Sequence, residues 1–288
     1  MVTILLFLRR GATIVLAEAP LERSMPVALR RRRMHLLYAT PYHYNLMVNS
    51  PDFTPEMLTG VRQAVATAMR LNPAEAVAFR SKFGLPLTQA YGIIEVGLPC
   101  LNDDWSEIRA ASVGRLQPGY ELRILRPGGD GIGEVQLRGP GLFDAYYHPF
   151  AWRRDLFPEG WFPTGDLGRV DADGYLFLCG RSKNVINFLG MKIFPEEVEA
   201  VIDRFPGIRE SRVSGRMLNG VEYPSAEVVL EPGCEWSPEF ERALRRHCFA
   251  TLARYQVPGE FTAVAALPRT ASGKIRRDGS GSEVGEQK

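Results

Sequence analysis

Residues 161–193 read WFPTGDLGRVDADGYLFLCGRSKNVINFLGMKI, and this stretch decides how the fold is organised. Two runs with the composition of β-strands flank an Asp-Gly pair that ends at Gly174. Glycine adopts the positive φ that a tight hairpin turn requires, so the pair is a strong hairpin signal. We therefore expect residues 168–170 and 175–179 to pair across this turn.

Two charged residues lie close to the ends of this hairpin. Asp166 stands just before its first strand, and Arg181 follows its second strand. The pairing would bring a hydrogen-bond acceptor and a permanently charged guanidinium to one mouth of the hairpin. Such a pair suits a ligand that carries both hydroxyl and phosphate groups.

The pattern of the chain changes twice, which predicts an α/β protein with a large domain at 1–182 and a second domain after it. Residues 1–111 alternate strand-like and helix-like runs and should form a partial α/β/α layer. Residues 112–182 hold short strand-like runs between Pro-Gly, Gly-Gly and Asp-Gly turns, which is typical of an antiparallel β-barrel-like subdomain. Residues 183–288 have a mixed α+β pattern and the size of a small lid domain.

Periodicity and turn residues give expected bounds for individual elements. A strand at 12–17, a helix at 26–33 and a strand at 34–38 would make a βαβ unit. A helix at 73–83 and a strand that ends at Tyr91 continue the alternation. The other expected elements lie further along the chain: strands 121–125 and 133–138, helix 195–204, a strand near Val213, strand 226–230, helix 238–254 and strand 261–265.

Composition places the chain among ordinary globular proteins. Its 288 residues are 45% hydrophobic and 24% charged, with a formal net charge of +2. This balance implies neither an acidic nor a basic partner. We expect the dense basic run Arg30–Arg33 to be the exposed side of a helix rather than a surface for nucleic acid or an anionic membrane. The apolar run Val2–Leu8 is too short to span a bilayer, so we expect no transmembrane segment there and a buried position for the run.

Cysteine and histidine spacing argues against a metal site. The four cysteines show no C-x-x-C spacing, and the four histidines lie far apart in the sequence. We therefore expect no structural metal and a reduced, cytoplasmic setting. Cys179 falls in the second strand of the expected hairpin and should be buried.

Ordered motifs in the chain resemble those of the adenylate-forming acyl-CoA synthetases, which are AMP-binding enzymes. Any one motif would be weak evidence, but several in the family's order are specific. The resemblance covers most of the chain, although only the later part of the family's pattern. The motifs are Tyr91-Gly92-Ile93-Ile94-Glu95, Thr164-Gly165-Asp166, Gly180-Arg181-Ser182-Lys183, Gly190-Met191-Lys192 with Pro195 and Glu197 after it, and Pro268-Arg269-Thr270-Ala271-Ser272-Gly273-Lys274.

The resemblance implies a nucleotide site. In the family, the aromatic residue at the position of Tyr91 stacks on adenine, and the glutamate at the position of Glu95 helps to hold magnesium. Asp166 would accept hydrogen bonds from the ribose hydroxyls, and Arg181 would also bind the nucleotide. ATP with Mg²⁺ is therefore the expected nucleotide.

The same resemblance implies a mobile C-terminal lid. Lys274 would bridge the carboxylate oxygen of the acid and the α-phosphate while the adenylate forms. The lid would then rotate about Lys183, so that Gly190, Met191 and Lys192 line the path by which the pantetheine of CoA enters. A lysine at the position of Lys183 favours the acyl-CoA synthetases over adenylation domains that make peptides.

Three departures from the family's pattern shape the functional expectation. Ile94 replaces a threonine that contacts the α-phosphate, and residues 66–68 replace a Gly-Gly turn near the acyl group. No Ser/Thr/Gly-rich phosphate loop precedes Tyr91. The resemblance thus implies a carboxylic acid:CoA ligase that is truncated or fragmentary, or is completed by a second chain. The alternative is a non-catalytic homologue that binds nucleotide, acyl-CoA or a partner chain.

Overall fold

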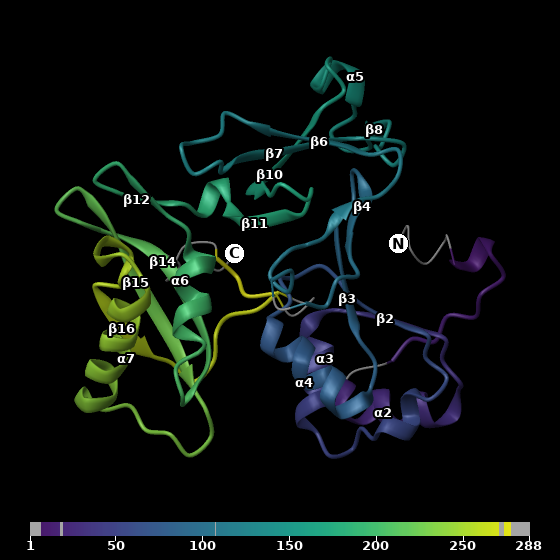
Figure 1. The fold of residues 1–288 in the computed structure, drawn as a ribbon, viewed down its shortest axis with the longest axis horizontal. Helices are drawn as coiled ribbons and strands as arrows, with labels where there is room; N and C mark the ends of the chain where they lie inside the picture. Colours follow the sequence, from purple (N-terminus) through teal and green to yellow (C-terminus); the bar gives the residue numbers. More distant parts are fainter. Residues whose placement is uncertain (1–6, 18–19, 107, 271–273, 278–288) are drawn as a thin grey trace, which may run out of the picture. The chain divides into compact units, whose positions relative to one another are not determined.

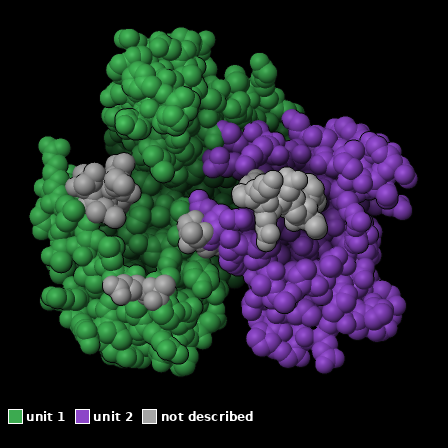
Figure 2. Space-filling view, turned by 180° about the vertical axis from the view of Figure 1, so that it is seen from behind, with its two compact units in different colours: residues 1–164, 168–178 green, residues 165–167, 179–288 purple. Residues whose placement is uncertain are grey.

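The computed structural model describes residues 7–17, 20–106, 108–270 and 274–277. The chain folds into two compact units (Figure 1, Figure 2). Unit 1 holds Met1–Thr164 and Gly168–Leu178, and unit 2 holds Gly165–Leu167 and Cys179–Lys288. The chain therefore passes from one unit to the other after Thr164, Leu167 and Leu178, within or beside the hairpin that the Asp-Gly pair predicted. The expected boundary between residues 182 and 183 stays a prediction.

Unit 1 contains a five-stranded sheet with the order β1-β2-β3-β4-β5. The first three strands are parallel, and β4 and β5 continue the sheet in antiparallel fashion. Figure 1 shows the helices α2, α3 and α4 gathered beside β2 and β3. The bounds are α2 Leu21–Arg31, β1 Leu36–Ala39, α3 Pro41–Asn49, η1 Pro55–Leu58, β2 Gln63–Ala66, α4 Pro73–Phe83, β3 Leu87–Ile93, β4 Gly97–Asn102 and β5 Arg115–Leu116.

Local sequence signals explain the helix that leads into β3. The Asn72 side chain accepts a hydrogen bond from the Ala74 N–H at 3.0 Å, and Pro73 occupies the first turn. Gly84 ends the helix with a φ of 67°. The predicted helix 73–83 is therefore confirmed, and it places Phe79 and Phe83 in the core of unit 1.

The expected strand at 12–17 is wrong, because these residues form no strand and are largely exposed. A strand requires a neighbour to pair with, and within the described residues β1 pairs with β2 only, so residues 12–17 do not extend the sheet beyond β1. Leu8 is 52% exposed, which contradicts the burial expected for the end of the first apolar run. Residues 2–6 of that run lie outside the described residues. The basic run Arg30–Arg33 is exposed, as expected, although α2 ends at Arg31 and the last two arginines lie beyond it.

Residues 121–181 contain an open sheet with the order β11-β10-β7-β6. Among the described residues it does not close into the expected barrel. Along the chain, a short ribbon of β8 and β9 and one turn of helix, α5, come after β7 and before β10. The bounds are β6 Glu121–Leu125, β7 Gly133–Arg138, β8 Ala145–Tyr146, β9 Ala151–Trp152, α5 Arg153–Leu156, β10 Phe162–Val170 and β11 Leu176–Arg181.

The predicted hairpin is confirmed as β10 and β11. Gly174 lies in its turn with a φ of 82°, and β10 alternates buried and partly exposed residues from Phe162 to Gly168. The Arg109 guanidinium forms ion pairs with Asp171 and Asp173 and stacks on a tyrosine ring 4.3 Å away. The turn is therefore fastened to a loop about sixty residues earlier in the chain.

Unit 2 holds a three-stranded sheet in which β15 lies between β14 and β16. Helices α6 and α7 pack against each other and against this sheet (Figure 1). β14 and β15 are antiparallel, whereas β15 and β16 are parallel. The bounds are η2 Ser182–Asn184, β12 Ile186–Phe188, β13 Met191–Ile193, α6 Pro195–Ile202, β14 Ile208–Leu218, β15 Val221–Leu230, α7 Pro238–Thr251, η3 Arg254–Gln256 and β16 Glu260–Ala263.

The elements of unit 2 follow the sequence-based expectation closely. Helix α6 begins at Pro195 with two glutamates in its first turn, which favour the positive end of the helix dipole. Helix α7 begins after Ser237, whose hydroxyl accepts a hydrogen bond from the Phe240 N–H at 3.1 Å. Within the described residues, no helix combines the length and apolar character that crossing a bilayer requires.

Candidate functional site

The first group of predicted site residues lies in unit 1, at the carboxyl end of β3. Tyr91 is 9% exposed in that strand. Glu95 lies in the turn that leads to β4, where the Tyr146 hydroxyl donates to its Oε1 at 3.3 Å. A Cβ on Gly92 would lie 2.3 Å from the Gly97 carbonyl oxygen, so β4 can approach only a glycine here. The strand and its turn thus bring an aromatic ring and a carboxylate to one sheet edge.

Ile94 and the turn at 66–68 are the two departures that the structure describes. Ile94 is 88% exposed and offers no hydrogen-bond donor from its side chain. Ala68 has a φ of 68°, a left-handed conformation that glycine adopts freely and alanine adopts at a cost of about 1 kcal/mol. The backbone at Ala68 therefore keeps a conformation typical of glycine although the residue there is alanine.

A cavity of about 340 Å³ lies between α4, β3 and the loop after β4. Gln89, two residues before Tyr91, lines it and is 5% exposed. No hydrogen bond joins its amide to another residue in the part of the chain that the structure describes. Because this polar side chain lines the cavity, Gln89 is a candidate ligand contact that the sequence analysis missed. Its only signal in the sequence is a polar residue within an otherwise buried strand.

The second group lies in unit 2. The Arg181 Nε is 2.6 Å from the Asp166 Oδ1, and the side chain of Asp166 is 8% exposed whereas that of Arg181 is 48% exposed. The hairpin therefore brings the predicted acceptor and cation into a direct ion pair. A ribose hydroxyl that binds Asp166 would share its carboxylate with this guanidinium.

The residues of the expected hinge and the expected CoA path follow directly after this ion pair. Lys183 is exposed in the short helix η2. Gly190 lies at the tip of the β12–β13 hairpin with a φ of 85°, and a Cβ there would meet no atom within 4 Å. Met191 and Lys192 follow in β13, and both are exposed. All four residues are therefore accessible.

Lys274 lies in the C-terminal segment of unit 2 and is exposed. Its N–H donates to the Thr270 hydroxyl at 3.2 Å, and the Thr270 N–H donates to the Lys274 carbonyl at 2.8 Å. Residues 271–273 of the predicted loop lie outside the described residues. The backbone of Lys274 is thus tied to the start of its own loop.

The structure allows a test of the expected magnesium site. Magnesium with ATP uses one or two protein carboxylates together with phosphate oxygens and water. Glu95 meets that modest requirement at the end of β3. Among the described residues, no group of three or more His, Cys, Asp or Glu side chains could hold a metal ion. Glu95 could therefore bind a magnesium ion only together with the phosphates of a nucleotide.

Burial excludes two of the cysteines as nucleophiles. All four are free thiols, and Cys100, Cys179 and Cys248 are buried. Burial raises the pKa of Cys100 to about 12 and that of Cys248 to about 11. These two thiols remain protonated near neutral pH, which excludes them as thiolate nucleophiles.

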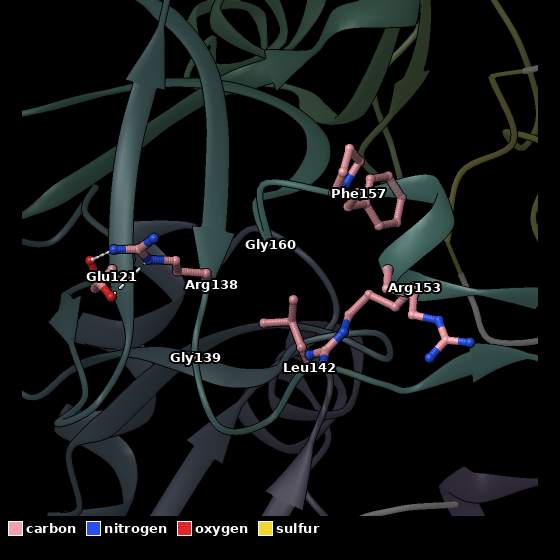
Figure 3. Close-up of a pocket in the computed structure, with 9 residues that line it drawn as sticks. Glu121, Arg138, Gly139, Leu142, Arg153, Phe157 and Gly160 are labelled. Atoms are coloured by element: carbon pink, nitrogen blue, oxygen red, sulfur yellow. Dashed lines mark hydrogen bonds and ion pairs between the residues drawn. The ribbon is translucent and has the colours of Figure 1, made fainter.

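A second cavity, of about 420 Å³, lies in the β-rich part of unit 1. Figure 3 shows the guanidinium of Arg138 joined to the carboxylate of Glu121 at its rim. Arg153 and Arg154 also line the cavity, and each has an aspartate within 4.0 Å. The cavity contains none of the predicted site residues.

Asp203 should make stability depend on pH. Burial, and then the carboxylates of Glu199 and Glu210, raise its pKa from 3.8 to about 7, although Ser211 donates a hydrogen bond at 2.7 Å. Between these two values the folded protein holds a proton that the unfolded chain releases, so stability falls as pH rises through that range and is constant above it. We expect Asp203→Asn to stabilise the protein by about 1–3 kcal/mol at pH 8 and to change little at pH 4.

Urea unfolding of both proteins between pH 4 and pH 8 measures this difference. Asp144→Asn is the control, because the side chain of Asp144 is 91% exposed. Equal pH slopes for wild type and Asp203→Asn would contradict the assignment.

Comparison with known proteins supports the family that the motifs indicated. Two family models match the chain: AMP-binding enzyme over residues 1–147 and AMP-binding enzyme C-terminal domain over residues 197–274. The first match alone covers half of the chain. The chain therefore belongs to the AMP-binding enzyme family.

Three relatives illustrate the match. Sulfoacetate–CoA ligase of Cupriavidus necator is 35% identical over 76% of this chain and 44% of its own length. Indoleacetate–CoA ligase of Aromatoleum aromaticum is 30% identical over 94% of this chain and 54% of its own length. The crystal structure of the anthranilate CoA ligase AuaEII in complex with anthranoyl-AMP superposes with a TM-score of 0.79, at 29% identity, over 92% of this chain and 53% of that one. The chain thus spans about half the length of the relatives it matches.

Proposed function

We propose that the protein activates a carboxylic acid with ATP through an acyl-adenylate and transfers the acyl group to CoA. The observation that carries the proposal is a similarity to acid–CoA ligases that extends through both family models. The solved relative that holds an anthranoyl-AMP supports an acyl-adenylate as the intermediate. A second chain is not part of the proposal, because no comparison supports one.

In the first half-reaction, a carboxylate oxygen attacks the α-phosphorus of ATP and pyrophosphate leaves. Two anions approach each other, so the step requires cations and donors that face the developing charge. We assign Lys274 to the carboxylate and the α-phosphate, and Tyr91 to the adenine face. Asp166 and Arg181 would hold the ribose and phosphate side of the nucleotide. Magnesium at Glu95 would neutralise phosphate charge when it is bound.

In the second half-reaction, the thiol sulfur of CoA attacks the acyl carbon and AMP leaves. We assign Lys183 to the hinge about which the C-terminal unit would turn. Gly190, Met191 and Lys192 would then line the pantetheine path. The open space at Gly190 supports this role, because a narrow chain can pass a residue that has no side chain.

Exchange of labelled pyrophosphate into ATP tests the proposal. We expect exchange that depends on an added carboxylic acid, drawn from a panel of aliphatic, aromatic and sulfonated acids, and that is independent of CoA. The reverse of adenylation alone can put the label into ATP. Absence of exchange with every acid, in a preparation that binds ATP, would contradict the proposal.

One observation favours a second candidate, a homologue that binds nucleotide without catalysis. The exposed Ile94 offers no hydroxyl to an α-phosphate. That candidate predicts ATP binding that weakens in Tyr91→Ala, together with no acid-dependent exchange. The proposed ligase predicts both the binding and the exchange.

A further inference from the structure

The segment that carries Lys274 is fastened to the body of unit 2 by arginines on both sides of the lysine. Arg277, three residues later, donates from Nη1 to the Glu199 Oε1 at 2.8 Å and from Nη2 to Oε2 at 2.6 Å. Arg269, five residues earlier, forms an ion pair with Glu210. Glu199 belongs to α6 and Glu210 to β14. Two elements of unit 2 therefore bind the segment that carries Lys274.

Backbone hydrogen bonds complete this attachment. The Arg276 N–H donates to the Pro268 carbonyl, and the Arg212 Nη1 donates to the Arg276 carbonyl, both at 2.8 Å. Arg212 is itself held by Glu227, with its Nε 2.6 Å from the Glu227 Oε2. Together with the two bonds between Thr270 and Lys274, these contacts fix both ends of the loop.

Glu199 is the most constrained member of this network. It is 7% exposed, and its Oε1 also accepts a hydrogen bond from the Val213 N–H at 2.7 Å. Burial raises its pKa, which Arg277 opposes by hydrogen bonding and charge. A buried ion pair gives little net stability compared with apolar residues of the same volume. A bidentate guanidinium–carboxylate pair does, however, fix the relative position of the two side chains.

We propose that Glu199 and Arg277 are positioning residues that set the location of Lys274 for adenylation, with Glu210 and Arg269 as the second attachment. The inference rests on the proposed function. Three residues span at most roughly 10 Å of extended chain, so the Glu199–Arg277 pair restricts where the Lys274 backbone can lie. A cation that stabilises developing charge must be placed within about 0.5 Å, and a long lysine side chain needs a fixed backbone to achieve this.

The test uses the full chain and separates the two half-reactions. Adenylation is followed by pyrophosphate exchange, and thioester formation is followed from a synthetic acyl-adenylate and CoA. In Glu199→Gln we expect kcat for adenylation to fall about tenfold or more while KM for ATP changes less than about twofold. Thioester formation should stay close to wild type, because Lys274 is assigned to the first step alone.

Conservative and control variants show whether a loss of adenylation comes from the positioning of Lys274 or from general destabilisation. Arg277→Lys retains the charge and should recover part of the adenylation rate that Arg277→Gln loses. Glu210→Gln, which alters the second attachment, should give a smaller loss of the same kind. Glu260→Gln is the control, because it removes the exposed ion pair with Arg216 elsewhere in unit 2. The melting temperature of each variant shows whether a loss follows general destabilisation.

The possible outcomes separate this inference from the proposed function. A selective loss of adenylation in Glu199→Gln, partly recovered by Arg277→Lys relative to Arg277→Gln, supports it. Equal loss of both half-reactions, or adenylation at the wild-type rate in all of these variants, would overturn the positioning role while the proposed function stands. A wild-type chain without adenylation would overturn both.

Discussion

Lys274→Ala should abolish most adenylation while leaving thioester formation from a supplied acyl-adenylate nearly intact. Removing one group that stabilises developing charge typically costs about 10²–10³ in rate, and Lys274 is the cation assigned to that charge. Its side chain is exposed and its backbone is held from both sides, so the truncation removes the charge without disturbing the core. Pyrophosphate exchange and CoA thioester formation, measured separately, check this expectation.

Gly190→Trp is the matched variant for the other half-reaction. A side chain at Gly190 would enter open space, and the positive φ of 85° would cost about 1–2 kcal/mol, so the protein should still fold. We expect adenylation close to wild type and a large loss of thioester formation. If both variants lose both half-reactions equally, the assignment of Lys274 and Gly190 to different steps is wrong.

The second large effect concerns the fold of unit 1. Gly114→Ala should destabilise the protein by more than about 3 kcal/mol, because a Cβ there would lie 1.9 Å from the Leu101 carbonyl oxygen. The residue also has a φ of 93°, and its carbonyl accepts a hydrogen bond from the Leu176 N–H at 2.9 Å. The backbone would have to move at the point where a strand of the hairpin meets the loop before β5.

Gly131→Ala provides the control for this prediction. Gly131 has a similar positive φ of 75°, yet a Cβ there would meet no atom within 4 Å. It should cost only about 1 kcal/mol, from the backbone conformation alone. Urea unfolding followed by tryptophan fluorescence compares the two variants. A loss of stability at Gly114 no greater than that at Gly131 would show that the close approach to Leu101 is not rigid.

Local signals in the sequence account for the elements that could be predicted. The Asp-Gly pair at Gly174 defines its own turn, and Asn72 and Gly84 mark the two ends of α4. The run at 12–17 has strand-like residues, but a strand depends on a partner that sequence periodicity does not reveal. The short strands expected after residue 112 are present, but in the described residues they form an open sheet, since closure depends on how distant strands pair.

The candidate site was predictable to the extent that motifs carry it. Asp166 and Arg181 flank a recognisable turn, so their proximity followed from the hairpin. The Glu199–Arg277 pair joins residues 78 positions apart, and no short sequence motif predicts it. Gln89 likewise becomes a candidate only when its burial beside a cavity is known. Long-range contacts of this kind require the three-dimensional structure.

The most direct test of the central claim is to identify the products formed from ATP and a carboxylic acid in the absence of CoA. The account predicts that mass spectrometry will detect an acyl-adenylate together with pyrophosphate, and that adding CoA will convert the adenylate to a thioester and AMP. Formation of ADP with an acyl phosphate, or of a thioester with no adenylate before it, would contradict the account.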